Sequence, residues 1–198
     1  TNDGNAGLGW TNVEALALYG WYTMFVYVAS IPGGILADRY IGQKSAVMWG
    51  GLLLCAGHGI LAINALWAFY TGLILIVLGV GCLKPNISTM VGGLYSKGDK
   101  RRDMGFYIFY MGINVGAFIC NFFGAALQIL LGWNYAFMAA GLGMFVGVIV
   151  FLLGSKYYGD KTDKKGFQQG DMPFYKIVLF IFYTSYIIFF YNTFVKDH

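Results

Sequence analysis

Lys84 is a residue whose sequence surroundings do not explain its charge. It lies in the stretch VGCLKPNIS (80–88), inside a long apolar run, and it is the only lysine or arginine between Lys44 and Lys97. An ammonium group inside a bilayer is costly and usually functional. The alternative is that its flexible stem carries the charge to the membrane surface. Pro85 follows directly and predicts a helix bend, which is tolerated where a neighbouring group or water satisfies the freed carbonyl. A lysine beside such a bend favours an ammonium that faces a wet cavity.

The other candidate residues inside apolar runs are neutral. His58 is flanked by glycines, which favours a packed, hydrogen-bonded imidazole over a proton relay. Asn114 follows Tyr110 by four residues, so the two share a helix face, and its amide could bind either another helix or a ligand. Tyr27 lies too deep for an interfacial aromatic belt and is expected to face the cavity. No carboxylate lies deep in an apolar run, so the acidic partner of Lys84 is expected from helices outside this sequence.

Membrane helices are the elements that must position these residues. Of the 198 residues, 58% are hydrophobic and 11% are charged, whereas a soluble domain has about 45–50% apolar and about 25% charged residues. Six apolar segments are long enough to cross a bilayer, and lipid permits only helices for them. The prediction is an all-α membrane protein. The segments lie at 13–37, 45–63, 67–91, 104–129, 134–154 and 174–195.

The basic residues predict how these helices are oriented. Lysine and arginine occur in every second connection, with two in 38–44, four in 95–103 and four in 155–173. The intervening connections and residues 1–12 contain none. The positive-inside rule therefore places the basic connections in the cytoplasm and residues 1–12 in an extracytoplasmic loop. Residues 155–173 are expected to be a cytoplasmic linker. An external N-terminus leads us to expect one more helix before residue 1.

Three motifs resemble known transporters. GGILADRYIGQK (33–44) is similar to the cytoplasmic signature between helices 2 and 3 of the major facilitator superfamily. GVGCLKPNISTMVGGLY (79–95), followed by GDKRRDMGFYIFYMGINVGAF (98–118), resembles the proton-dependent oligopeptide transporter family. The resemblance implies a partial N-terminal major facilitator bundle. Its five helices within 13–154 would be family helices 2 to 6, and segment 174–195 would be helix 7 or an extra hairpin helix.

The resemblance also implies a function. The expected activity is proton-coupled symport of di- and tripeptides by alternating access in the cytoplasmic (inner) membrane, with protons as the coupling ion and no other cofactor. Lys84 would serve proton coupling and bind the peptide carboxylate, and Pro85 would supply the helix kink. Further substrate contacts would come from Tyr27, Tyr110 and Asn114. The cytoplasmic gate and its motif would comprise Asp38, Arg39, Arg101, Arg102 and Asp103.

Several expectations follow for partners and rival functions. Family helix 1, with its Glu-x-x-Glu-Arg motif, and the C-terminal bundle are needed for a complete transporter. The alternatives are a transporter of another small solute, such as nitrate, on the same scaffold, or a non-transporting half-subunit that needs a partner chain. The expected partners are a peptide and the lipid bilayer, and not nucleic acid, because no basic stripe accompanies a nucleic-acid-binding fold. An enzyme is disfavoured because neither paired carboxylates nor a nucleophile with its base is present at membrane depth.

Overall fold

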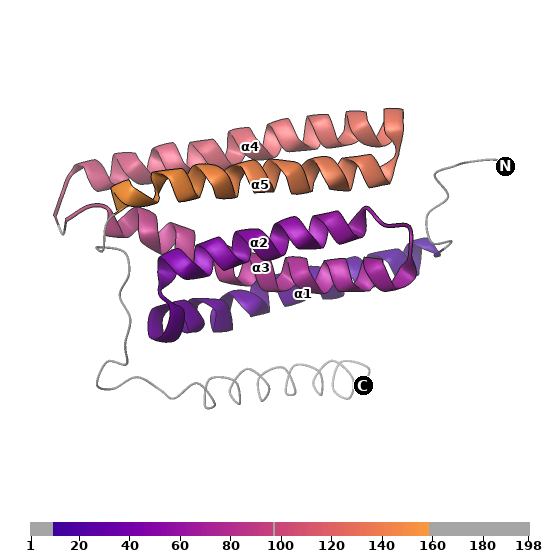
Figure 1. Cartoon of the computed structure of the whole chain (residues 1–198), viewed down its shortest axis with the longest axis horizontal. Coiled ribbons are helices and arrows are strands. Elements are labelled where there is room, and N and C mark those ends of the chain that lie inside the picture. Colours follow the sequence, from indigo (N-terminus) through magenta and orange to yellow (C-terminus); the bar gives the residue numbers. More distant parts are fainter. Residues whose placement is uncertain (1–9, 97, 159–198) are drawn as a thin grey trace, which may run out of the picture. The chain divides into compact units, whose positions relative to one another are not determined.

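Every long element of the described structure is a helix. The computed structural model describes residues 10–96 and 98–158 (Figure 1). Its elements are α1 (Asn12–Leu36), the π-helical turn η1 (Ala37–Ile41), α2 (Gln43–Leu61), α3 (Leu66–Gly93), α4 (Arg101–Leu131) and α5 (Trp133–Tyr158). The all-helical prediction is confirmed, and these helices occupy the first five predicted segments. The sixth, 174–195, lies outside the described residues.

All five helices extend beyond the apolar runs that predicted them at one end or both, and α3, α4 and α5 do so by two or more residues towards the basic loops. α3 continues to Gly93, α4 begins at Arg101, and α5 continues to Tyr158, which lies inside the segment predicted as a linker. Hydropathy marks only the residues that lie in hydrocarbon, whereas backbone hydrogen bonding continues the helix into the polar layer. The predicted boundaries were therefore too short at these ends.

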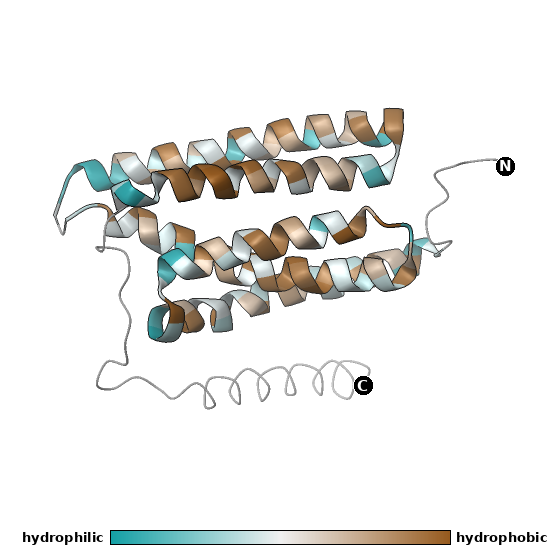
Figure 2. Cartoon of the chain, viewed as in Figure 1, coloured by the Kyte–Doolittle hydropathy of each residue, from teal (hydrophilic) through white to brown (hydrophobic). Residues whose placement is uncertain are grey.

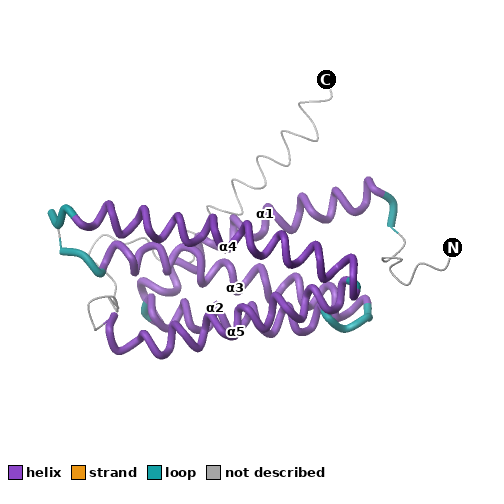
Figure 3. Tube along the Cα trace, turned by 90° about the horizontal axis from the view of Figure 1, so that it is seen from above, coloured by secondary structure: helices purple, strands orange, loops and turns teal. Residues whose placement is uncertain are grey.

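Consecutive helices run in opposite directions, so their connections lie at two ends (Figure 1). In a view turned by 90°, the described loops are again confined to these ends (Figure 3). We call the end that carries residues 37–44, 94–96 and 98–100 and Lys156 the basic end; hydrophilic residues gather there (Figure 2). Lys44 Nζ donates to the Ser155 carbonyl at 3.3 Å and thereby joins the start of α2 to the last turns of α5 at this end.

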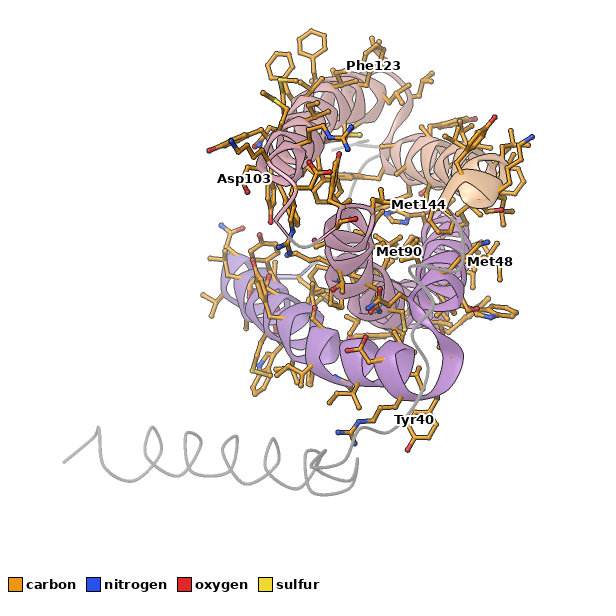
Figure 4. The ribbon with its side chains drawn as sticks, turned by 90° about the vertical axis from the view of Figure 1, so that its left-hand side faces the viewer. Tyr40, Met48, Met90, Asp103, Phe123 and Met144 are labelled. Carbon is orange, nitrogen blue, oxygen red and sulfur yellow. The ribbon has the colours of Figure 1, made fainter. Side chains whose placement is uncertain are left out.

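The core lies between α2 and α3. Its buried residues are Leu54 and Leu61 from α2 and Ile76 from α3. Partly buried residues pack around it from α1, α3 and α5: Tyr22, Phe69, Val80, Leu83, Phe137 and Met144. Viewed from the basic end, Met90 and Met144 lie among the helices, whereas Phe123 of α4 lies on the outside (Figure 4).

Glycines bring α2 and α3 into close contact. A Cβ added at Gly50 would lie 2.8 Å from the Gly79 carbonyl oxygen, and one added at Gly79 would lie 2.8 Å from the Gly50 oxygen. Gly57 and Gly72 face each other in the same way, at 3.0 and 2.9 Å. Small residues at such positions let helix backbones approach closely, which supports helix association in lipid. The abundant glycines therefore serve packing at these positions.

α2 and α4 differ most in their surroundings. Within residues 10–96 and 98–158, four helical segments are long and apolar enough to cross a membrane: α1 with η1, α3, α4 and α5. α2 was also predicted to span, but it is shorter, contains Lys44 and His58, and falls outside this group. It has eight buried residues, whereas α4 has none. α2 is thus largely covered by protein, and the surface of α4 remains open within the described part of the chain.

Candidate functional site

Lys84 and Tyr27 lie side by side on α3 and α1. The Lys84 ammonium nitrogen is 4.7 Å from the centroid of the Tyr27 ring, where the ring face attracts a cation. Tyr27 lies nine residues before the end of α1 and Lys84 nine residues before the end of α3, or about 14 Å from these ends. The ammonium is therefore beside the middle of a neighbouring helix. The contact holds the Lys84 side chain against α1 instead of extended towards the basic end, and the cavity that it was expected to face stays a prediction.

The Lys84 charge is accessible and lacks an acidic partner within the described residues. Both Lys84 and Tyr27 are exposed, with 62% of Tyr27 accessible. No carboxylate of residues 10–96 or 98–158 lies within ion-pair distance of Lys84. An ammonium at membrane depth is stable only when paired or hydrated, so the exposed Lys84 charge requires water or an anion beside it.

Asn86 was missed as a candidate, although it lies in the same motif. It is 2% exposed. Its Nδ2 donates to the Cys82 carbonyl of α3 at 2.6 Å and to the Gly33 carbonyl of α1 at 3.3 Å. An asparagine two residues after Lys84 points to another side of the helix. A neutral polar side chain at membrane depth was the only signal in the sequence, and on that ground Asn86 could have been added to the candidate residues.

Tyr110 and Asn114 share a face of α4, as predicted from their spacing. Asn114 Nδ2 donates to the Tyr110 carbonyl at 2.8 Å, so this bond is neither the interhelical bond nor the ligand contact that we considered. The Tyr110 ring stacks on Phe106, with centroids 6.3 Å apart. Among the described residues, no hydrogen bond or ring contact joins Tyr110 or Asn114 to Lys84 or Tyr27. The structure therefore brings together two of the four predicted substrate residues.

The π-helical turn η1 carries Asp38 and Arg39 at the basic end. Asp38 Oδ1 accepts a hydrogen bond from Gln43 Nε2 at 3.1 Å, which links the turn to the first residue of α2. The N–H of Gly42 donates to the Ala37 carbonyl at 2.8 Å and closes the turn. The φ of Gly42 is +81°, a conformation that glycine adopts without steric cost. The GQK part of the motif thus fixes the path of the chain after Asp38 and Arg39.

The second basic motif begins α4. The Arg101 side chain binds Asp99 through Nε–Oδ1 (3.1 Å) and Nη2–Oδ2 (2.9 Å). Hydrogen bonds from the Arg101 side chain and backbone lower the pKa of the Asp99 carboxyl below its ordinary value. The Arg102 guanidinium lies 5.8 Å from the Phe106 ring centroid. Asp103 is exposed in the first turn of α4, where its charge suits the helix dipole. Asp99 was not among the candidates.

A cavity of about 1210 Å³ lies at the end opposite the basic end. Its lining is mostly apolar and includes the aromatic residues Trp10, Tyr22 and Trp133, together with His58. His58 Nδ1 lies 2.8 Å from the Leu54 carbonyl oxygen, so the ring nitrogen must donate this bond. The hydrogen bond agrees with the predicted packed state of this histidine.

Comparisons with known proteins agree with the motifs. The model of the POT family matches residues 44–189. The chain is 43% identical over 150 residues to the peptide transporter YePEPT of Yersinia enterocolitica, covering 74% of this chain and 29% of that protein. It is 41% identical over 162 residues to a di-/tripeptide transporter of Lactobacillus helveticus, covering 77% and 33%. The chain thus spans about a third of the length of these relatives.

A solved structure has the same arrangement of helices. The chain matches a crystal structure of a mutant peptide transporter POT in complex with alafosfalin with a TM-score of 0.79 and 38% identity. The match covers 96% of this chain and 40% of that one. The similarity supports the interpretation of the chain as part of a major facilitator helix bundle.

Proposed function

The chain belongs to the POT family, and we propose that it is part of a proton-coupled symporter for di- and tripeptides that works by alternating access. It is a multi-pass membrane protein of a transporter family. The observation that carries the proposal is the position of the Lys84 ammonium, 4.7 Å from the Tyr27 ring and without a carboxylate partner in the described residues. The names of the relatives support peptides as the substrate class.

The proposed orientation follows from charge. The connections at the basic end carry Arg39, Lys44, Lys100, Arg101 and Arg102, whereas residues 62–65 and Gly132 at the opposite end include no lysine or arginine. We place the protein in the cytoplasmic membrane. By the positive-inside rule, its basic end faces the cytoplasm. The start of α1 then faces outside, and the turn η1 belongs to the cytoplasmic gate together with the beginning of α4.

The proposed mechanism uses Lys84 as an electrostatic switch. Its ammonium pairs either with the carboxylate of a peptide or with the carboxylate of an acidic side chain outside the described residues, which leaves the pair when it takes up a proton. Exchange between these partners changes the free-energy difference between inward- and outward-facing states, because the new ion pair favours one of them. Tyr27 supports the ammonium through its ring face. Proton release and peptide release on the cytoplasmic side then complete the cycle.

Tyr110 and Asn114 serve as the proposed substrate contacts on α4. One N–H of the Asn114 amide is engaged with the Tyr110 carbonyl, which holds the side chain in one orientation. Its Oδ1 and remaining N–H are then available to the backbone of a peptide, which presents both a donor and an acceptor at each residue.

The ring of Tyr27, and not its hydroxyl, is expected to support Lys84. Tyr27→Phe should therefore keep peptide affinity within about twofold, whereas Tyr27→Leu should weaken it about two- to fivefold, since an exposed cation–π contact contributes about 0.5–1 kcal/mol. The measurement is the half-saturating dipeptide concentration for uptake by the complete transporter. An equal loss in Tyr27→Phe and Tyr27→Leu, both of which lack the hydroxyl, would assign the contribution to the hydroxyl instead.

The substrate class is tested by competition. Proteoliposomes with the complete transporter, energised by an inwardly directed proton gradient, are expected to accumulate a labelled dipeptide. Unlabelled di- and tripeptides should inhibit this uptake, and free amino acids and nitrate should not. Inhibition by nitrate alone would favour another solute on the same scaffold. Peptide uptake that appears only after a second polypeptide is added would favour the half-subunit.

A further inference from the structure

Asn86 has the most deeply buried polar side chain of the described residues, at 2% exposed. Burying an amide is unfavourable unless its hydrogen bonds are formed, and Asn86 forms one within α3 and one to α1. An apolar residue would fill the same space without this requirement. The amide therefore has a role other than filling space between the helices.

α1 and α3 are both weakened where Asn86 joins them. Pro32 lies inside α1 and Pro85 inside α3, and each removes one backbone donor from its helix. In α3 the carbonyl left without its usual N–H is that of Gly81, four residues before Pro85. This oxygen abuts Gly33, because a Cβ added at Gly33 would overlap it. The two helices thus touch at points where each can bend.

The Gly33 carbonyl connects this contact to the basic end. It accepts Asn86 Nδ2 at 3.3 Å and also the backbone N–H of Ala37, the first residue of η1. Asn86 is two residues from Lys84, and Ala37 directly precedes Asp38. A single acceptor therefore joins the segment that carries the Lys84 ammonium to the turn that carries the basic-end motif.

We propose that Asn86 is a positioning residue that couples the state of Lys84 to the turn η1. Its bond to Cys82 (2.6 Å) lies within α3 and moves with that helix, whereas its longer bond to Gly33 crosses to α1. A change of partner at Lys84 that shifts α3 therefore alters the hydrogen bond to Gly33, and with it the last turn of α1. This inference rests on the proposed function in one respect, namely the role of Lys84 as an electrostatic switch.

The test separates the two hydrogen bonds of Asn86. In Asn86→Thr, the hydroxyl can still bond the Cys82 carbonyl four residues back, as Thr89 does to Pro85 at 2.9 Å, but it is too short to reach Gly33. Thr89→Val is the matched control, because it removes a hydrogen bond that lies within α3 only. Asn86→Ser serves in the same role if Asn86→Thr does not fold.

The readout is the alkylation rate of a cysteine introduced by Tyr40→Cys in the complete transporter, after alanine replacement of Cys55, Cys82 and Cys120. Tyr40 belongs to η1, is 50% exposed and lies on the outside at the basic end (Figure 4). Lys84→Gln, which removes the charge, is expected to change this rate about fivefold or more when Asn86 or the Thr89→Val control is present. With Asn86→Thr, the same change should fall below about twofold.

Three outcomes would overturn the proposal. Lys84→Gln could change the alkylation rate equally with Asn86 and with Asn86→Thr, or the change could be lost equally in Thr89→Val. Lys84→Gln could also leave the rate unchanged even when Asn86 is present. Alkylation needs neither peptide nor a proton gradient. A protein that fails to take up peptides would therefore contradict the proposed function while leaving the coupling test valid.

Discussion

Lys84→Ala in the complete transporter is expected to abolish peptide accumulation driven by a proton gradient. The ammonium lies 4.7 Å from the Tyr27 ring, and no carboxylate of the described residues neutralises it. We therefore expect its partner to be an anion that arrives with the substrate or with the rest of the protein. Lys84 is exposed in the described residues, but we expect its ion pair to be buried in the complete transporter. Truncating one member of a buried charge pair costs about 2 kcal/mol or more, which corresponds to about 30-fold or more in driven uptake. The measurement is the initial rate of labelled dipeptide uptake into proteoliposomes with an imposed pH gradient.

Two controls make this result specific. Lys100→Ala removes an exposed lysine in the connection before α4, and uptake should be unchanged. Peptide exchange without a gradient then separates the two tasks assigned to Lys84. Exchange that survives in Lys84→Ala assigns the loss to proton coupling, whereas a parallel loss assigns it to carboxylate binding. Undiminished gradient-driven uptake by Lys84→Ala contradicts both tasks.

Gly33→Ala is expected to have the second large effect. Its Cβ would overlap the Gly81 carbonyl oxygen and lie 2.5 Å from the Gly81 carbonyl carbon. Both are backbone atoms, so no side-chain rotation can relieve the overlap, and α1 and α3 must separate. Overpacking of this kind costs about 1–3 kcal/mol. We expect a thermal unfolding midpoint several degrees lower in detergent, together with weakened uptake because Tyr27 moves away from Lys84.

The neighbouring glycine provides the matched control. A Cβ at Gly34 would meet only the Pro85 Cβ, at 3.8 Å, which is an ordinary contact. Gly34→Ala adds the same methyl group to the same helix one residue later and should leave the unfolding midpoint within about a degree of the parent protein. If both substitutions lower the midpoint equally, the effect belongs to glycine content and not to the contact between α1 and α3.

The helices could be predicted because lipid permits only one backbone solution for a long apolar segment. Their ends were less predictable, since α5 continues through Ser155 to Tyr158 on backbone hydrogen bonds that hydropathy does not report. The contacts between helices could not be predicted from the sequence either. Glycine is abundant throughout, yet only the crossing geometry decides that Gly50 meets Gly79, whereas a Cβ added at Gly112 or Gly116 would meet no atom of another described element within 4 Å.

In the site, too, single residues could be predicted from the sequence, whereas the contacts between them could not. Lys84, Pro85 and Tyr27 stood out because charge, a missing N–H and depth are properties of single residues. The contact between Lys84 and Tyr27 depends on how α1 crosses α3, and no spacing encodes that. Asn86 was overlooked because its neutral amide resembles the other polar residues of the apolar runs until its partner, the Gly33 carbonyl, is known.

The position of the Lys84 ammonium in the complete, peptide-bound transporter tests the central claim most directly. The measurement is the distance from Lys84 Nζ to the nearest carboxylate oxygen in an experimental structure with a dipeptide. We predict an ion-pair distance, within about 4 Å, to the peptide or to an acidic side chain, with the Tyr27 ring still against the ammonium. A Lys84 side chain extended to the lipid headgroups, with no carboxylate in reach, would contradict the account.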